Sequence, residues 1–377
     1  MLELHAQNLA NLAARGRLRA LTPRAGLDFA SNDYLALAES PALAAAVTAA
    51  LARGVPVGAG GSRLLRGNHP EHEALEEEAA GFFGAESALY FSAGFTANEA
   101  LLSTAPQRED LILYDALAHA SAHEGMRLAR AAHARFPHND VGAAEDAIRV
   151  WRGKGGGGRI WIVVESLYSM DGDKAPLDDL YALAARNDAF LLIDEAHATG
   201  VYGPGGRGLA ARFEGAENVV TLHTCGKAMG VAGGLLCLPR ILRDFMINRC
   251  RPFIFATAPS PLIAACVRAA LRIIEAADDR RAELMSRIDF AGAELRRLCA
   301  IDPSGSQIQP IIVGTDIRAT ALASRLQAHG YDIRAIRPPT VPEGSARLRI
   351  ALTLHACQED LARMIAHLGD ALERLEP

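Results

Sequence analysis

Residues 190–197 read Phe-Leu-Leu-Ile-Asp-Glu-Ala-His, an apolar run that ends on charged and polar residues. The run is continuous instead of alternating, as is typical of a strand buried on both faces of a parallel sheet. Similar runs of strand length lie at Ala88–Phe91, Leu111–Tyr114, Ile160–Glu165, Val219–His223 and Gly234–Leu238. Helical patterns separate several of them, at residues 71–83, 97–104, 143–151 and 176–186. This alternation predicts an α/β domain with a mostly parallel central sheet.

The pattern changes after Pro261. Helical patterns cover residues 261–300, 317–329 and 359–375, and short strands are predicted at 307–313, 332–336 and 347–352. We therefore predict three parts: an N-terminal segment over residues 1–40, a large α/β domain over 41–275 and a small C-terminal α+β domain over 276–377.

Composition excludes several classes of protein. The 377 residues are 50% hydrophobic and carry a net charge of −5, so no basic surface indicates a nucleic-acid partner. Apolar runs are far shorter than the roughly 20 residues of a membrane span. The six cysteines form no CxxC pair, which predicts reduced thiols in a cytoplasmic protein. We expect no metal site, because the pair His119 and His123 lacks the glutamate position of HExxH or HxxEH.

Only three of the 39 basic residues are lysines, namely Lys154, Lys174 and Lys227. Because arginine keeps its proton in proteins, chemistry that needs a neutral amine has only these three candidates. Lys154 stands beside four glycines and Lys174 follows Asp-Gly-Asp, which is typical of solvated turns. Lys227 follows a predicted strand and has small neighbours, which leave room for a bulky group on its amine.

Asp194 ends one predicted strand and Lys227 comes just after the next. The carboxyl ends of parallel strands meet at one edge of a sheet, where α/β proteins bind ligands. A lysine for a Schiff base and a carboxylate for a pyridinium nitrogen are the groups that a pyridoxal-phosphate site needs. The turn at Gly94-Phe95 begins a predicted helix, whose N-terminal amides suit a phosphate. These features together predict a pyridoxal-phosphate site.

Two competing motifs are rejected on their context. Residues 194–197 match the ATPase motif Asp-Glu-Ala-His, but the required GxxxxGK[ST] loop is missing and Ala228 follows Lys227. Gly203, Gly205 and Gly208 have GxGxxG spacing, yet they lie about nine residues after their strand and no acid stands about 20 residues further on. We interpret them as an ordinary glycine-rich loop.

Blocks along nearly the whole chain resemble the α-oxoamine synthase family of fold-type-I pyridoxal-phosphate enzymes. The blocks are Ser31–Leu35, Gly58–Arg63, Phe91–Phe95, Asp115–Ser121, Ser169–Gly172, Asp194–Gly200 and Arg347–Ile350. Residues 335–342 are similar to the C-terminal signature of the biotin-pathway member, which condenses L-alanine with a pimeloyl thioester. The resemblance implies the fold-type-I transferase fold, a C-acyltransferase activity and a homodimer. It leaves open whether coenzyme A or acyl carrier protein carries the acyl group.

The resemblance also implies residue roles at the cofactor. Lys227 matches the Schiff-base lysine, Asp194 the partner of the ring nitrogen, and His119 the histidine stacked on the ring. Further cofactor contacts are implied for Gly94, Phe95, Ser169, His197 and Thr224. Arg349 resembles the arginine that binds the amino-acid carboxylate, and other substrate contacts are implied for Arg19, Asn32, His119 and Thr340.

Three other functions stay open from the sequence. Another member of the same family would use glycine and acetyl-CoA. A fold-type-I aminotransferase shares the lysine and the aspartate but would accept a 2-oxo acid and release no thiol. A non-enzymatic binding protein would hold the cofactor without reacting with any amino acid.

Overall fold

The structure is a computed structural model that describes residues 1–375, and it divides into two compact units. The large unit comprises Leu35–Ser169 and Lys174–Arg281, and the small unit comprises Met1–Tyr34, Met170–Asp173 and the residues from Ala282 onward. The division predicted at residues 40 and 275 stays a prediction, and residues 376–377 of its last part lie outside the described residues.

Seven strands of the large unit form one sheet within the described part of the chain, in the order β2-β8-β7-β6-β5-β3-β4. Their bounds are β2 (Ser87–Phe91), β3 (Leu111–Asp115), β4 (Ala132–Phe136), β5 (Ile160–Glu165), β6 (Phe190–Asp194), β7 (Val219–Thr224) and β8 (Gly234–Leu238). Strand β8 runs in the direction opposite to the other six strands, so the expected mostly parallel sheet is confirmed.

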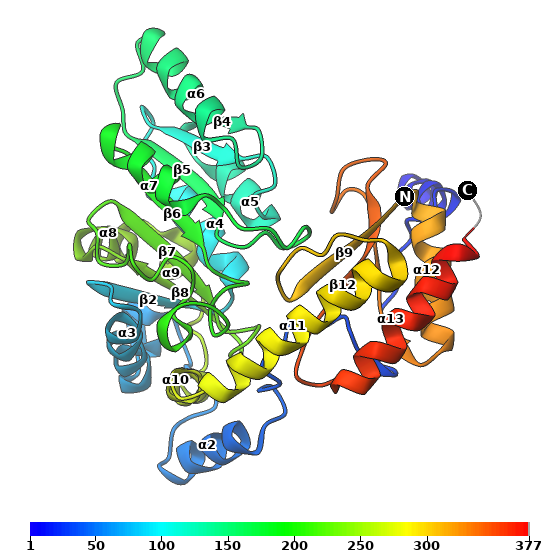
Figure 1. Cartoon of the computed structure of the whole chain (residues 1–377). Helices are drawn as coiled ribbons and strands as arrows, with labels where there is room; N and C mark the ends of the chain where they lie inside the picture. The colour runs from blue at the N-terminus through cyan, green and yellow to red at the C-terminus, as the bar shows by residue number, and fades with distance from the viewer. Residues whose placement is uncertain (376–377) are drawn as a thin grey trace. The chain divides into compact units, whose positions relative to one another are not determined.

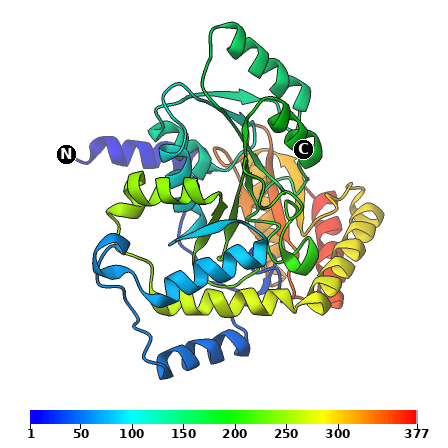
Figure 2. The same cartoon turned by 90° about the vertical axis from the view of Figure 1, so that its left-hand side faces the viewer.

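Helices of the large unit cover both faces of this sheet (Figure 1). They are α2 (Pro41–Ala52), α3 (Pro70–Phe83), α4 (Gly94–Thr104), α5 (Ala120–Leu128), α6 (Val141–Gly153), α7 (Leu177–Arg186), α8 (Arg240–Arg249), α9 (Arg251–Ile254) and α10 (Pro261–Glu275), with single turns η1 (Arg63–Gly67) and η2 (Pro204–Gly206). The helices α3 and α10 run side by side (Figure 2).

Strand alternation sorts the side chains of the sheet into two hydrophobic cores. In β5, Trp161 and Val163 pack in the core beneath α4 and α5, whereas Ile162 and Val164 pack with α6 and α7. The final residue, Glu165, follows in the same alternation and therefore belongs to the face of α4 and α5. This face is where the polar residues discussed below collect.

Strand β4 was missed by the sequence prediction. It lies at the edge of the sheet, and three of its five residues are exposed, with only Phe136 buried. Its sequence Ala-His-Ala-Arg-Phe accordingly lacks the continuous apolar run that identified the central strands. An edge strand is hydrogen-bonded to one neighbour and is more exposed to solvent, so its composition predicts a strand less clearly.

The small unit is an α+β arrangement. Its elements are α1 (Glu3–Ala14), β1 (Leu27–Asp28), α11 (Asp278–Cys299) from Ala282 onward, β9 (Ile308–Gly314), α12 (Asp316–Ala328), β10 (Tyr331–Asp332), β11 (Ala335–Ile336), β12 (Ala346–Ala351) and α13 (Gln358–Glu373). The strands form an antiparallel sheet β11-β12-β9 and a separate parallel pair β1-β10. The single strand predicted over 332–336 is thus split between two sheets. No helix in residues 1–375 is both long and apolar enough to cross a membrane.

Candidate active site

Asp194 and Lys227 lie at the carboxyl edge of neighbouring parallel strands. Asp194 is the last residue of β6 and pairs in register with Leu222 of β7, and Lys227 follows β7 by three residues. The Lys227 Nζ atom is 2.7 Å from Nε2 of His197, which comes from the turn after β6. Strand order therefore brings together the amine, the imidazole and the loop of the predicted carboxylate.

The carboxylate of Asp194 is buried and held at both oxygens. Its side chain accepts a bond from the Ala196 amide at Oδ1 (2.9 Å) and one from Asn98 Nδ2 at Oδ2 (2.6 Å). The residue is only 8% exposed. A buried, doubly hydrogen-bonded carboxylate keeps a fixed orientation, as a partner for a ring N–H requires.

Asn98 also connects Asp194 to His119. Its Nδ2 donates to Ser121 Oγ (3.0 Å), and that hydroxyl lies 2.8 Å from His119 Nδ1. His119 is the N-cap of α5, and its Nδ1 accepts the Ser121 amide N–H. Desolvation of the ring is the main cause that lowers the pKa of His119; the charge of Asp194 raises it, and the smaller effect of the charge of Lys227 lowers it. The imidazole is thus favoured in its neutral form.

The N-terminus of α4 supplies the predicted phosphate contacts. Ala93, its N-cap, makes no side-chain cap bond, so the first amides of the helix are left for a ligand. A Cβ on Gly94 would come within 3.1 Å of Thr224 Oγ1, which places these two predicted contacts side by side. The Phe95 ring lies edge-on to His119 with 6.2 Å between centroids.

These residues fit pyridoxal phosphate. The large unit combines a lysine amine, a buried carboxylate, an uncapped helix N-terminus beside a glycine and a histidine of lowered pKa. Ser169, the remaining predicted cofactor contact, is 8% exposed and its amide donates to Glu165 Oε2 (3.0 Å). The other two lysines differ: Lys154 ends α6, and Lys174 lies over the Tyr202 ring. No group of acidic, histidine and cysteine residues in the described chain could hold a metal ion.

Apart from His119, which lies in the large unit, the predicted substrate residues belong to the small unit. Arg349 in β12 is 6% exposed, and its Nη2 donates to the Tyr34 hydroxyl (3.2 Å), which in turn donates to Asn32 Oδ1 (3.0 Å). Its neighbour Arg347 is also buried and pairs with Asp171 at 2.5 Å. Arg349 is therefore not a solvent-facing strand arginine.

Arg19 and Thr340, the predicted acyl contacts, also meet within the small unit. The Nη2 atom of Arg19 donates to Thr340 Oγ1 at 3.2 Å, and both residues are exposed. The pairing joins a segment between α1 and β1 to the loop that precedes β12.

Asn98 was not among the sequence candidates. Asn98 and Gly94 are four residues apart in α4, so they share a face of the helix. Asn98 lies within the predicted helix, but helical periodicity alone does not show which polar residue faces the carboxylate of Asp194, so Asn98 was not singled out.

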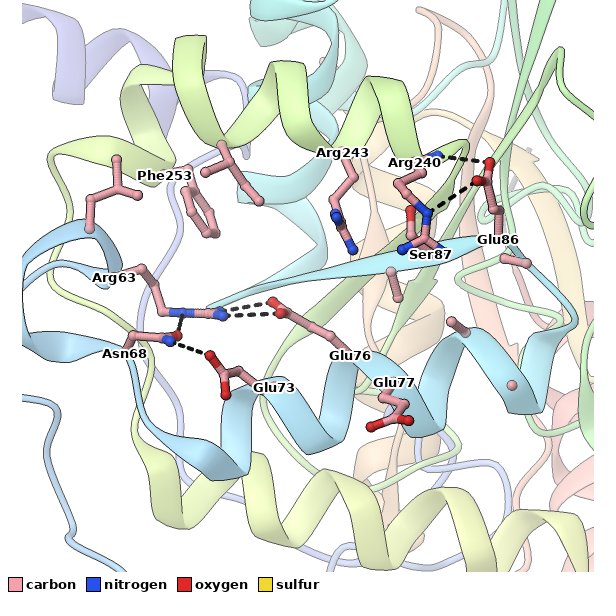
Figure 3. A pocket seen from close by; sticks show the side chains of 16 residues that line it. Arg63, Asn68, Glu73, Glu76, Glu77, Glu86, Ser87, Arg240, Arg243 and Phe253 are labelled. Atoms are coloured by element: carbon pink, nitrogen blue, oxygen red, sulfur yellow. Dashed lines mark hydrogen bonds and ion pairs between the residues drawn. The ribbon is translucent and has the colours of Figure 1, made fainter.

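A cavity of about 690 Å³ lies elsewhere in the large unit, and none of the predicted site residues lines it (Figure 3). Its charged groups are largely paired with each other. Arg63 donates to both oxygens of Glu76 and to Asn68, and Arg240 pairs with Glu86 (Figure 3). Such internal pairing makes the cavity part of the scaffold around α3 and β2, and it does not compete as a reaction site.

The fold and this site define a fold-type-I pyridoxal-phosphate transferase. The chain belongs to the aminotransferase class I and II family, whose model matches residues 24–368. It is 42% identical over 357 residues to the 8-amino-7-oxononanoate synthase of Azoarcus sp. (strain BH72), covering 93% of this chain and 88% of that protein.

Solved structures agree with this assignment. The serine palmitoyltransferase of Sphingomonas wittichii matches with a TM-score of 0.88 and 28% identity, covering 99% of this chain and 98% of that one. The 8-amino-7-oxononanoate synthase of Francisella tularensis matches with a TM-score of 0.78 and 26% identity, covering 92% and 98%. The chain is thus a pyridoxal-phosphate enzyme, and the predicted fold type and cofactor are confirmed.

Proposed function

We propose that the protein condenses L-alanine with a pimeloyl thioester to give 8-amino-7-oxononanoate, with carbon dioxide and the free thiol as the other products. The observation that carries this proposal is the 42% identity to an 8-amino-7-oxononanoate synthase over 93% of the chain. The carbon–carbon bond that forms joins the α-carbon of alanine to the acyl carbon, and the bond to the alanine carboxylate breaks. The acyl thiol leaves with a proton.

Pyridoxal phosphate, when bound, supplies an electron sink for bonds broken at the alanine α-carbon. Lys227 Nζ is proposed as the base that takes the α-proton, a role that needs a neutral amine. Its 2.7 Å distance to His197 Nε2 supports this role, because a hydrogen bond between the two groups fixes the position of the amine. Positioned proton transfer of this kind typically contributes roughly 10²–10⁴-fold to a rate.

Asp194 is proposed to face the ring nitrogen of the cofactor and to keep it protonated. Support comes from its fixed geometry, since the Ala196 amide and Asn98 Nδ2 hold its two oxygens. His119 is proposed to stack on the ring. Its lowered pKa favours the neutral imidazole, so that stacking adds no positive charge beside the ring. Gly94, Phe95 and Thr224 are proposed to bind the phosphate.

Arg349 is proposed to bind the alanine carboxylate through a bidentate pair. Its burial and its bond to Tyr34 support this role, because they limit the rotamers of a side chain that must orient a substrate. Asn32 is tied to the same tyrosine. Arg19 and Thr340, which bond to each other, are proposed to contact the acyl substrate.

An amino-donor assay tests the proposed function. Purified protein with bound cofactor is given alanine or glycine, each with pimeloyl-CoA or acetyl-CoA, and thiol release and carbon dioxide are measured. The proposal predicts turnover with alanine and pimeloyl-CoA. Turnover with glycine and acetyl-CoA alone would instead indicate a different member of the family, and exchange with a 2-oxo acid without thiol release would indicate an aminotransferase.

We further propose a homodimer in the cytoplasm. The described cysteines are all free thiols and four are buried, which supports a reducing compartment. Sedimentation at several concentrations tests the dimer. Parallel assays with pimeloyl-CoA and pimeloyl-acyl carrier protein decide which carrier the enzyme uses.

A further inference from the structure

Glu165, the last residue of β5, lies directly beside Asp194. The two residues are register partners in the parallel pair β5-β6, so their side chains lie on the same face of the sheet. Glu165 is 3% exposed and Asp194 is 8% exposed. Two carboxyl groups on adjacent strands are thus buried together at the edge of the sheet that carries the candidate site.

The two oxygens of Glu165 have different surroundings. Oε2 accepts the Ser169 amide N–H at 3.0 Å, whereas Oε1 is buried without a hydrogen-bond partner in the described chain. Glu195 is equally buried, yet its oxygens accept the amides of Leu209 (2.8 Å) and Ala210 (2.9 Å). Leaving a charged oxygen buried and unpartnered costs far more than leaving a neutral one, which disfavours the carboxylate form of Glu165.

The charges that face Glu165 also favour its protonated form on balance. Asp194 on β6 opposes a second negative charge, and Asp115 at the end of β3 adds a smaller repulsion, while Lys227 is the one opposing attraction. Burial, and after it Asp194, raise the pKa of Glu165 to about 8. Asp115 has a partner of its own in His138, at 2.9 Å.

We propose that Glu165 is a positioning residue that stays protonated beside Asp194, so that the pair carries a single negative charge confined to Asp194. The neutral acid leaves Asp194 as the only anion available to the cofactor ring, and its second oxygen fixes the turn that carries Ser169. The proton on Oε1 is free to bond to a water or to the bound cofactor. This inference rests on the proposed role of Asp194 for its function, although the protonation itself does not.

Infrared difference spectroscopy on the cofactor-free protein tests the protonation directly. Subtracting the spectrum of Glu165→Gln from that of the wild type at about pH 7 should show the C=O stretch of a protonated carboxyl group, which fades as the pH rises through about 8. Bands of an ionised carboxylate at about pH 7 would overturn the proposal. Because no cofactor is present, failure here is distinct from failure of the proposed function.

A stability profile gives a second readout. An acid whose pKa is raised on folding contributes stability below its unfolded value near 4.5 and loses it as the pH rises through about 8. Denaturation of cofactor-free Glu165→Gln should therefore show a flatter fall in stability over this range than the wild type. Parallel profiles for the two proteins would contradict the proposal.

Glu195→Gln is the matched control, because Glu195 is as buried and burial also raises its pKa to about 8. It should remove a different carboxyl band, so a band lost only in Glu165→Gln belongs to Glu165, and it should lose additional stability because one of its two acceptor oxygens is lost. The infrared result for Glu165 stands even if this control fails to fold.

Titration with the cofactor tests whether Glu165 acts as a neutral group and Asp194 as a charged one. Glu165→Gln keeps a neutral group and an acceptor for the Ser169 amide, so cofactor affinity should stay within about threefold of the wild type. Asp194→Asn, which removes the charge, should weaken it by roughly 10–150-fold, the loss expected for a charged hydrogen bond. A tenfold or larger loss in Glu165→Gln would overturn the proposal, whereas unchanged binding in Asp194→Asn would contradict only the role of Asp194.

Discussion

The bond between Asn98 and Asp194 offers a quantitative test of how the site is built. Asn98 is 2% exposed, and its Nδ2 lies 2.6 Å from Asp194 Oδ2, so this bond joins a buried amide to a buried carboxylate. Hydrogen bonds to charged groups contribute about 1.5–3 kcal/mol, against about 0.5–1.5 kcal/mol for neutral pairs. The free energy of unfolding should therefore contain a coupling of about 1.5–3 kcal/mol between these two residues.

A double-mutant cycle measures this coupling. Asn98→Ala, Asp194→Ala and the double variant are unfolded in urea without cofactor, and the coupling is the departure of the double variant from additivity. A matched cycle between Asn98 and Ser121, whose bond is 3.0 Å and neutral, should give a coupling no larger than about 1.5 kcal/mol. Additive effects for Asn98 and Asp194, within about 0.5 kcal/mol, would refute the claim that Asn98 holds the carboxylate.

Three further predictions concern single side chains. Arg349→Lys keeps the charge but loses the bidentate fork, so kcat/KM for alanine should fall by about 1.5–3 kcal/mol with cofactor binding unchanged; an unaltered kcat/KM would exclude the carboxylate clamp. His119→Phe keeps a flat ring, so cofactor affinity should largely persist while turnover falls, and His119→Ala with neither property changed would indicate mere packing. Burial alone would raise the pKa of Asp115, but bonds from His138 and two backbone amides lower it on balance. Its contribution to stability is present above its unfolded pKa of 3.8 and is lost as the pH falls through the lower native pKa, so Asp115→Asn should flatten the decline in stability below that unfolded value, and an unchanged slope would contradict this.

Much of the large unit follows from apolar runs in the sequence. The six predicted strands are present because central parallel strands are buried on both faces, which demands continuous apolar residues. The order of β6 and β7 then fixes where Asp194 and Lys227 lie, since both follow the carboxyl ends of neighbouring strands. The edge strand β4 was not predicted, because its solvent-exposed residues do not need to be apolar.

The polar contacts around the site were harder to predict. Glu165 is the last residue of a correctly predicted strand, but its neighbour Asp194 is set by sheet register, which an apolar pattern does not specify. Arg347 and Arg349 alternate along β12 and so share a face, but their partners Asp171 and Tyr34 are distant in sequence. Such partners depend on tertiary folding, so the roles of Ser169 and Arg349 came from family resemblance.

The most direct test of the account is to identify the lysine that bonds to the cofactor. Borohydride reduction of the protein with bound pyridoxal phosphate, followed by peptide mapping, should place the cofactor on Lys227 and remove the visible absorbance band of the bound form. Lys227→Ala, treated in the same way, should carry no reduced cofactor. A label on Lys154 or Lys174 in the wild type, or label retained in Lys227→Ala, would contradict the account.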